Sequence, residues 1–336
     1  MSTNRSSRAR RRALLSLRGL VALVWMVALT SAPAMGWAQS WPGKAVTLVV
    51  PFPPGGSNDV AARVVAESAR KRLGQPVVVD NKPGANGALG VDAVLRAPKD
   101  HHTFLVASDS VSLLPLFRAT PWDLGKSFTP VAVLSTQPIV VVTAASSGLK
   151  TMQDLQARAR GKPDQVPYAS SGQGSIQHLV GELFAHNLGI NLLHIPYKGG
   201  GQAVTDVIAG QVTVAVLGAA AVLPHIKSGK LVALAVSTRQ RSPMLPDTPT
   251  LAESGAGDID VPQWSALFAV QDTPAAVMAQ LRRSVEDSLA EPSVKQQLLN
   301  LSMETVVTTP QAFQQRMLQD RERWARLVKD RKISLD

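Results

Sequence analysis

Short β-branched runs alternate with helical patterns along almost the whole chain, and this alternation restricts the fold more than any other feature. Residues 46–50 are typical of a buried strand, and residues 59–73 follow with the 3.6-residue period of an amphipathic helix. Further strands are predicted at 76–80, 103–107, 138–142, 166–170, 192–196, 212–216, 231–236 and 267–270. Further helices are predicted at 151–160, 176–188, 275–289 and 311–330, with a small-residue helix that ends near residue 97 and another that includes residues 203–208. This order predicts an α/β fold with mostly parallel sheets covered on both faces.

The strand and helix pattern falls into two units. The rhythm restarts near residue 138, and the strand at 267–270 is expected to return to the first unit, so the chain would cross between units near 138–146 and 260–270. We predict a first domain from residues 39–140 and 263–336, and a second from residues 141–262. Two units joined twice can close over a ligand by a hinge motion.

Two glycine-bearing turns each lead into a predicted helix. They are PFPPGGSND at 51–59 and SSGQGS at 170–175, and both follow the carboxyl end of a predicted strand. The start of a helix presents unpaired backbone N–H groups and a partial positive charge, so two of them facing one another could hold a small dianion without Arg or Lys. The pattern favours a carboxylate receptor, although each turn alone could be a simple connector.

The first 38 residues have the layout of a cleaved secretory signal peptide. Six Arg precede or enter a short apolar run, and small residues follow it, with cleavage expected after Ala38 and Ala34 as the alternative. The apolar run is shorter than the ~20 residues of a membrane span, which argues against a retained anchor. The general and the twin-arginine export routes both stay open. We therefore expect a soluble periplasmic protein that begins near Gln39.

Charge and composition exclude several classes of function. The formal charge of +11 falls to 11 − 6 = +5 without the leader, and the remaining Lys and Arg are scattered, so nucleic-acid binding is not expected. The chain has no Cys, which removes thiolate metal sites, lipidation and Cys nucleophiles. We predict neither a cofactor nor a metal site. The adjacent His101 and His102 are interpreted as part of a solvated loop.

Several longer motifs, in order, resemble Bug-type extracytoplasmic solute receptors, the substrate-binding proteins of tripartite tricarboxylate transporters. The first domain contributes WPGK at 41–44, the turn at 51–59 and GQPVVVDNKPGANG at 74–87. The second contributes the turn at 170–175 with HL at 178–179 and GELF at 181–184, then PYKGGG at 196–201 and PHIKSGK at 224–230. The similarity covers nearly all of the chain after the leader.

The resemblance implies a two-domain periplasmic binding protein of the Venus-flytrap, type II-like kind with a double-strand hinge. It also implies capture of a small carboxylated solute and delivery to inner-membrane transporter subunits, and we expect a monomer. The ligand-binding residues that it implies are Phe52, Pro54, Gly55, Ser57, Asn58, Asp59, Ala85, Ser108, Ser171, Gly172, Gly174, Ser175 and Asp206. The chain departs from the family at DHH (100–102), WSA (264–266) and GAA (218–220), and the last two changes could reshape the pocket.

The alternative function is a secreted α/β hydrolase acting on a carboxylic ester. Ser175 and His178 are three residues apart, but a serine at a helix start usually caps its own amides, and the chain has no Gly-x-Ser-x-Gly elbow. We therefore predict a binding protein without enzymatic activity. Asp59 could be a helix N-cap as well as a ligand contact, and Trp264 could belong to the core or to the wall of the cleft. The sequence leaves open which acid is bound.

Overall fold

The computed structural model describes residues 41–161, 165–330 and 332–333. The predicted leader lies outside these residues. Within the described residues, no helix combines the length and the apolar character that crossing a membrane requires. From Trp41 onward the chain groups into one compact unit.

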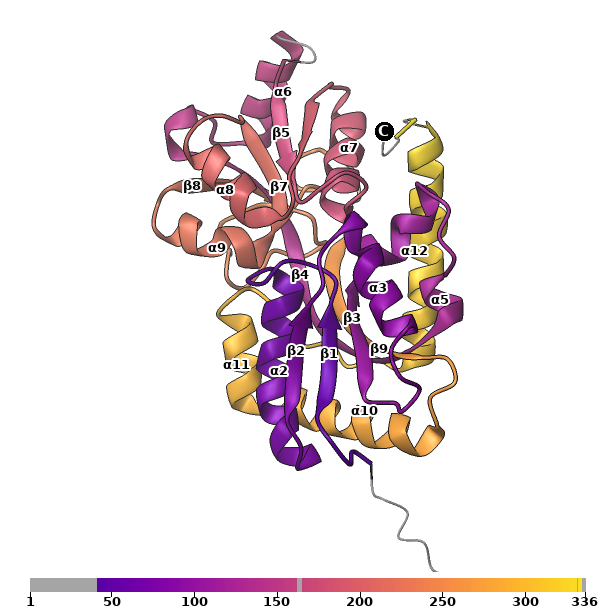
Figure 1. Cartoon of the computed structure of the whole chain (residues 1–336). Helices are drawn as coiled ribbons and strands as arrows, with labels where there is room; N and C mark the ends of the chain where they lie inside the picture. Colours follow the sequence, from indigo (N-terminus) through magenta and orange to yellow (C-terminus); the bar gives the residue numbers. More distant parts are fainter. Residues whose placement is uncertain (1–40, 162–164, 331, 334–336) are drawn as a thin grey trace, which may run out of the picture. The chain divides into compact units, whose positions relative to one another are not determined.

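The first group of strands has the order β2-β1-β3-β9-β4 (Figure 1). β1 (Val46–Val50) pairs in parallel with β2 (Val77–Asn81) and β3 (Thr103–Ser108). β9 (Pro262–Val270) is antiparallel to β3 and to the first part of β4 (Phe128–Ala144). The near-continuous apolar sequence of β1 and β3 suits strands that are covered on both faces.

The second group uses the last part of β4. There β4 is antiparallel to β7 (Val214–Gly218) and β8 (Leu231–Val236), and β5 (Pro167–Ser170) joins β7 to β6 (Leu193–Pro196) through parallel pairs. The partner of β4 changes from β9 to β7 between Pro138 and Ile139. Every antiparallel pair therefore involves β4 or β9, the two strands predicted to cross between units, and all other pairs are parallel.

β4 is longer than predicted, because it begins at Phe128 and not near 138. Pro130 and Pro138 resemble strand breakers in the sequence. In this first part β9 is the one named strand that pairs with β4, and the other edge of β4 carries a single bridge from Thr136 to Glu304, so this part behaves as an edge strand, where proline is tolerated. Register shifts near Pro130 and Val133 absorb the remaining irregularity.

Eleven α-helices are assigned among the described residues. They are α2 (Ser57–Leu73), α3 (Ala88–Leu95), α4 (Asp109–Leu113), α5 (Leu124–Ser127), α6 (Met152–Gly161), α7 (Ile176–Leu188), α8 (Gly200–Ile208), α9 (Ala219–Lys227), α10 (Ala275–Ala290), α11 (Pro292–Leu299) and α12 (Pro310–Asp330). Short 3-10 turns occupy Ala85–Gly87, Leu114–Leu116 and Ala145–Ser147. The sequence did not predict α4, α5, α9 and α11, because they are too short for a clear helical period.

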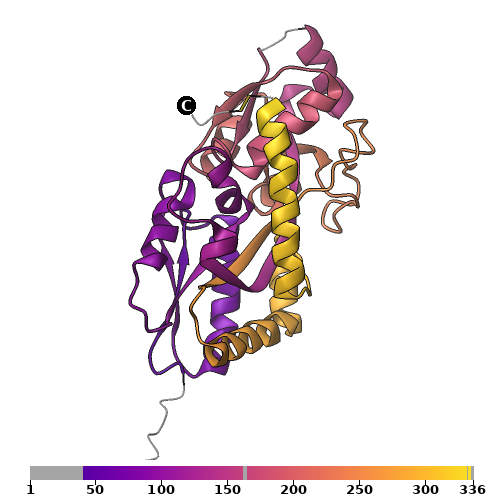
Figure 2. The same ribbon diagram turned by 90° about the vertical axis from the view of Figure 1, so that its right-hand side faces the viewer.

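The helices cover both faces of the sheet. α2 and α10 pack on one face of the first group, and α3 and the first half of α12 pack on the other. α6 and α7 cover one face of the second group, and α8 and α9 the other. The long α12 (yellow in Figure 2) also places Trp324 in the core around α7. The domain boundaries at 140/141 and 262/263 stay a prediction, although the change of strand partner lies beside both.

Candidate functional site

The first glycine turn leads directly from β1 into α2. Gly56 occupies the N-cap position of α2, so no side chain caps this helix start. The first helical hydrogen bond is donated by the Val60 amide to the Gly56 carbonyl at 3.0 Å, which leaves the amides of Ser57 and Asn58 without a helical acceptor. Asn58 is buried, and its Oδ1 accepts no hydrogen bond from any described residue. This helix start has the properties of an anion site.

Asp59 orders the turn, but it is not the N-cap residue. It lies in the third helical position, where its Oδ2 accepts hydrogen bonds from the Gly55 amide at 2.9 Å and from Arg63 Nε at 3.0 Å. Burial raises the pKa of Asp59, but the bonds from Arg63 and Gly55 outweigh it and hold the net pKa below its ordinary value. The other oxygen, Oδ1, lies 2.9 Å from Arg63 Nη2 in an ion pair but accepts no hydrogen bond from a described residue. The bond from Gly55 lets the carboxylate fix the left-handed turn at that residue, where φ is +81°.

Other predicted residues of the first domain surround this helix start. The carbonyl of Phe52 accepts a hydrogen bond from Asn81 at 3.1 Å, and its ring packs against the cores on both faces of the first sheet group. Pro54 is exposed at the tip of the turn. Ala85 is exposed in a second loop with a φ of +49°, followed by Asn86 at +54°. Two consecutive non-glycine residues in this region indicate a constrained loop.

The second turn is internally hydrogen-bonded, which differs from the open socket predicted for it. The amide of Gly172 donates to Ser170 Oγ at 3.1 Å, and the amide of Gly174 donates to Nδ1 of His178 at 3.1 Å. Ser175 caps α7 by accepting from the His178 amide at 3.2 Å, and its hydroxyl donates to the Gly172 carbonyl at 2.6 Å. Side chains therefore occupy the Gly172 and Gly174 amides, two of the groups that the sequence suggested for a ligand. Ser171, which lies between Ser170 and Gly172 in the turn, is half-buried.

Two stacked imidazoles hold the second turn through hydrogen bonds to Ser170 and Gly174. His178 and His194 lie face to face with ring centroids 3.8 Å apart, and His194 Nε2 is 2.7 Å from Ser170 Oγ. Burial lowers the pKa of His178 to about 4 and that of His194, next to His178, to about 3. Both rings are therefore neutral near pH 7, and His178 carries its proton on Nε2 because Nδ1 accepts from Gly174. His178 positions the turn and does not activate the Ser175 hydroxyl.

Two hydrogen bonds join the first strand group to the second turn and to the start of α7. Asn86 Nδ2 donates to the Gln173 carbonyl at 3.0 Å, and the Ile176 amide donates to Ser110 Oγ at 3.3 Å. The first bond joins the loop after β2 to the turn before α7, and the second joins α4 to α7. Sequence reasoning missed Asn86 and Ser110 as bridging residues, although Asn86 lies within the quoted family motif. Neither bond involves residues 51–59 of the first turn.

The sheet below this region carries polar groups. Ser108, at the end of β3, pairs in register with Ser265 of β9, and both are buried. Strand alternation puts Ser265 on the same face as Leu267, which packs in the core with α2. Ser265 Oγ forms no hydrogen bond within the described residues. The sequence had marked Ser265 only as a departure from the family pattern. Its hydroxyl is the kind of group that a carboxylate can bind.

Two candidates remain, Asp206 and Trp264. Asp206 on α8 accepts a 2.7 Å hydrogen bond from Tyr197 Oη, and burial together with that bond raises the pKa of Tyr197 to about 12. Trp264 belongs to the core on the opposite face of the sheet, where it contacts Phe313 edge-on. Beside it, burial raises the pKa of Asp109 to about 7 despite hydrogen bonds from the amides of Trp264 and Ser110.

The histidine pair at 101–102 is half-buried, so the expectation of a solvated loop was wrong. The indole of Trp41 donates to the carbonyl of His101 at 2.8 Å, and Nδ1 of His102 lies 2.6 Å from the Asp100 carbonyl. These bonds hold the pair against the start of the described chain. Among the described residues, no three His, Cys, Asp or Glu side chains are grouped closely enough to hold a metal ion.

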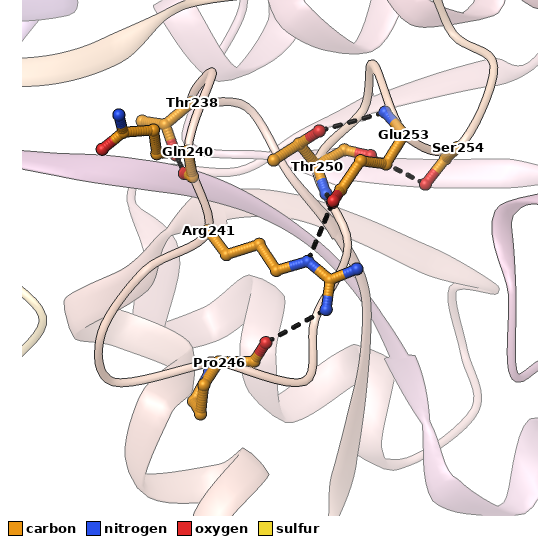
Figure 3. A network of polar contacts seen from close by, with 7 residues as sticks. All are labelled: Thr238, Gln240, Arg241, Pro246, Thr250, Glu253 and Ser254. Atoms are coloured by element: carbon orange, nitrogen blue, oxygen red, sulfur yellow. Dashed lines mark hydrogen bonds and ion pairs between the residues drawn. The ribbon is translucent and has the colours of Figure 1, made fainter.

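A separate polar network lies in the loop that follows β8, between Thr238 and Ser254 (Figure 3). This loop is far along the chain from both glycine turns. Arg241 Nε donates to Glu253 at 2.9 Å, and Glu253 in turn accepts from the Thr250 amide at 2.7 Å. Thr250 Oγ1 accepts from the Glu253 amide at 3.0 Å, which completes a reciprocal pair of bonds like a capping box. This network stabilises the 238–254 loop, and none of its residues was predicted to bind ligand.

Comparison with known proteins identifies the family. Residues 61–333 match the family described as "Tripartite tricarboxylate transporter family receptor". The chain is similar to BugT of Bordetella pertussis, with 35% identity over 296 residues that cover 87% of this chain and 91% of BugT. Among solved structures it resembles the periplasmic binding protein BugD, with a TM-score of 0.81, 33% identity, and coverage of 88% of this chain and 99% of that one. It also resembles Rpa4515 of R. palustris, solved with adipate, with a TM-score of 0.83, 30% identity, and coverage of 88% and 99%.

These similarities confirm the predicted periplasmic-binding-protein fold and the resemblance read from the motifs. The chain belongs to the tripartite tricarboxylate transporter receptor family, a family of solute receptors and not of enzymes.

Proposed function

We propose that this receptor captures a small organic carboxylate between the start of α2 and the second turn, and delivers it to an inner-membrane transporter of the tripartite tricarboxylate type. The observation that carries the proposal is the uncapped start of α2, whose Ser57 and Asn58 amides lack helical acceptors. The buried hydroxyls of Ser108 and Ser265 lie on the sheet face that α2 covers. Rpa4515, solved with adipate, supports a carboxylate as the class of solute.

The charge around the α2 start supports neutralisation by hydrogen bonds and not by a free cation. Arg63, the basic residue on the first turns of α2, is occupied: it bonds Asp59 and also donates to Asn81 Oδ1 at 2.9 Å. A carboxylate would therefore be held by backbone N–H groups, hydroxyls and the positive end of the helix dipole. Such short-range bonds in a partly buried site are weakly screened by salt.

Solute capture would favour contact between the two turns. A carboxylate that touches both sides binds the closed arrangement better than the open one, and this differential affinity stabilises closure. The bonds from Asn86 to Gln173 and from Ile176 to Ser110 are the contacts that would form or strengthen on closure. We further propose that the protein works in the periplasm as a monomer after removal of residues 1–38.

Binding of acids and of their amides tests the proposed function. We expect isothermal titration to show binding of at least one dicarboxylic acid, such as adipate or succinate, and a loss of affinity of more than about tenfold for the matched diamide, because an amide cannot supply the anionic acceptors. Raising NaCl from 20 to 500 mM should change the affinity by less than about threefold. Equal binding of acids and amides, or abolition of binding by salt, would contradict the mechanism.

A further inference from the structure

Three buried glutamines from different elements form one hydrogen-bonded relay. Gln137 comes from β4, Gln263 from β9 and Gln177 from the first turn of α7, and their exposed fractions are 5%, 8% and 3%. Oε1 of Gln263 accepts hydrogen bonds from Nε2 of Gln137 at 3.2 Å and from Nε2 of Gln177 at 3.1 Å. The sequence analysis did not single out any of the three, because their contacts are separated by 86 and 126 residues along the chain.

A single backbone amide fixes the orientation of all three side chains. The N–H of Ala220, in the first turn of α9, donates to Oε1 of Gln137 at 2.9 Å. A backbone N–H can only donate, so Gln137 must turn its oxygen to Ala220 and its nitrogen to Gln263. Gln263 must then present its oxygen, and Gln177 must present its nitrogen to that oxygen. The relay therefore has one polarity, with no freedom for an amide flip.

This polarity leaves the carbonyl oxygen of Gln177 as a buried acceptor. Oε1 of Gln177 accepts no hydrogen bond from any described residue. An unsatisfied buried amide oxygen costs roughly 1–3 kcal/mol, so a fixed relay that creates one requires an explanation. Ser265 Oγ, two residues along β9 from Gln263 and on the same face of the strand, is also buried without a described partner.

Gly218 makes room for the relay. A Cβ atom at this position would lie 2.6 Å from Gln263 Oε1 and 2.9 Å from Gln137 Nε2. The backbone of Gly218, with φ −62° and ψ 141°, is open to any residue, so the requirement for glycine is one of space and not of conformation. Gly218 is the first residue of the sequence GAA, one of the two departures from the family pattern that could reshape the pocket.

We propose that the relay makes Gln177 Oε1 a specificity-determining acceptor, so that the preferred solute carries a hydrogen-bond donor, a hydroxyl or an ammonium group, in addition to its carboxylate. This inference rests on the proposed function and adds a second requirement to it. The relay joins the crossing strands to the starts of α7 and α9, and Gln177 follows Ser175 of the second turn by two residues. A donor on the carbon skeleton of the solute would satisfy the oxygen that the relay leaves unpaired.

Matched pairs of acids test this inference by isothermal titration of the full mature chain. The pairs are succinate with malate and with aspartate, glutarate with 2-hydroxyglutarate and with glutamate, and tricarballylate with citrate. We expect the wild type to bind a donor-bearing member about tenfold or more tightly than its unsubstituted partner, because the unmatched acceptor is otherwise left buried. Gln177→Met keeps the length of the side chain and removes its amide, so the ratio should fall to about twofold or less. Binding of the unsubstituted acid should change by less than about threefold.

Two further variants make the result specific to the relay. Gly218→Ala changes no residue of the relay, but its Cβ would lie 2.6 Å from Gln263 Oε1 and displace that side chain, so it should also reduce the ratio. Gln296→Met, on α11, removes an exposed glutamine whose amide bonds Asn300, and it should leave the ratio unchanged. Circular dichroism and thermal unfolding check the fold of each variant. If Gln177→Met does not fold, Gly218→Ala replaces it as the variant that tests the relay.

The possible outcomes separate this inference from the proposed function. A wild-type ratio near one, or an equal loss for both members of a pair in Gln177→Met, would overturn the specificity role while carboxylate binding stands. A wild-type protein that binds none of the acids would contradict the proposed function and this inference with it.

Discussion

Replacing Asp59 by alanine is expected to weaken carboxylate binding by about 10- to 100-fold with little loss of fold. The carboxylate holds the Gly55 amide and the Arg63 guanidinium, and hydrogen bonds to a charged group contribute about 1.5–3 kcal/mol each. Without the Asp59 carboxylate, the 51–56 turn would be ordered only when the ligand binds, and the cost of ordering it would reduce the affinity. Arg63 is half-exposed and can be solvated after the change, so part of the loss is recovered, and the protein should stay folded with a thermal midpoint lowered by several degrees.

A neighbouring acid on the same helix is the matched control. Glu67 forms an exposed ion pair with Arg70, and such surface pairs contribute about 0–1 kcal/mol. Glu67→Ala should therefore keep wild-type affinity, and Asp59→Asn, which retains one acceptor oxygen, should lie between Asp59→Ala and wild type. Calorimetric titration of one bound acid measures all three. Wild-type affinity in a folded Asp59→Ala protein would show that the turn needs no such anchor.

Acidification is expected to destabilise the protein through the stacked histidines. The pKa values of His178 and His194 are about 4 and about 3 in the folded protein, below the ordinary value of 6.5, because both rings are buried. Between pH 6.5 and 4 the unfolded chain binds more protons than the folded chain at these two sites, so stability falls as the pH falls. Protonation of His178 would also place an N–H against the Gly174 amide and break the bond that holds the second turn.

Asp109 opposes this effect. Its folded pKa of about 7 exceeds the ordinary 3.8, so its contribution to stability is complete below pH 3.8 and is lost as the pH rises to about 7. Near pH 5 the unfolded chain holds about two protons on these histidines and the folded chain holds about one on Asp109, so the net slope there is at most about 1.4 kcal/mol per pH unit. The slope is smaller near pH 6.5, where the histidines of the unfolded chain are only half-protonated. The free energy of unfolding of the wild type should therefore fall as the pH is lowered, with this slope.

Urea unfolding of three proteins at pH 4.5–7.5 measures the slope. His194→Phe keeps an aromatic ring against His178 but removes one titrating site, so its free energy of unfolding should be nearly independent of pH in this range. His186→Phe changes an exposed histidine of the same region and should retain the wild-type slope. A wild-type stability that rises on acidification, or an unchanged slope in His194→Phe, would show that these rings do not control the acid response.

The fold could be predicted from the sequence wherever the signal is local. α7 shows apolar residues at helical spacing between Ser175 and Gly189, and both ends agree with the structure, with Ser175 as N-cap and Gly189 as a left-handed C-cap. The first half of β4 was missed because Pro130 and Pro138 imitate strand ends, and only the edge position of this segment, a property of the assembled sheet, explains why they are tolerated.

The candidate site was predicted in outline but not in its hydrogen bonding. Glycine turns and a helix start can be recognised within ten residues of sequence, and in the structure the loop after β2 is hydrogen-bonded to the second of these turns. The partners of the turn amides could not be predicted in this way. His194 supports the second turn from a strand 24 residues beyond Ser170, and the glutamine relay joins three elements. Such contacts depend on the packing of distant segments, which no local pattern records.

A crystal structure of the mature protein with a bound dicarboxylic acid is the most direct test of the account. The account predicts carboxylate oxygens within hydrogen-bonding distance, about 2.7–3.2 Å, of the Ser57 and Asn58 amides at the start of α2, with Ser108 or Ser265 also in contact. An acid bound instead on the opposite face of the sheet, in the recess lined by Asp109, Trp264 and Arg316, would contradict it.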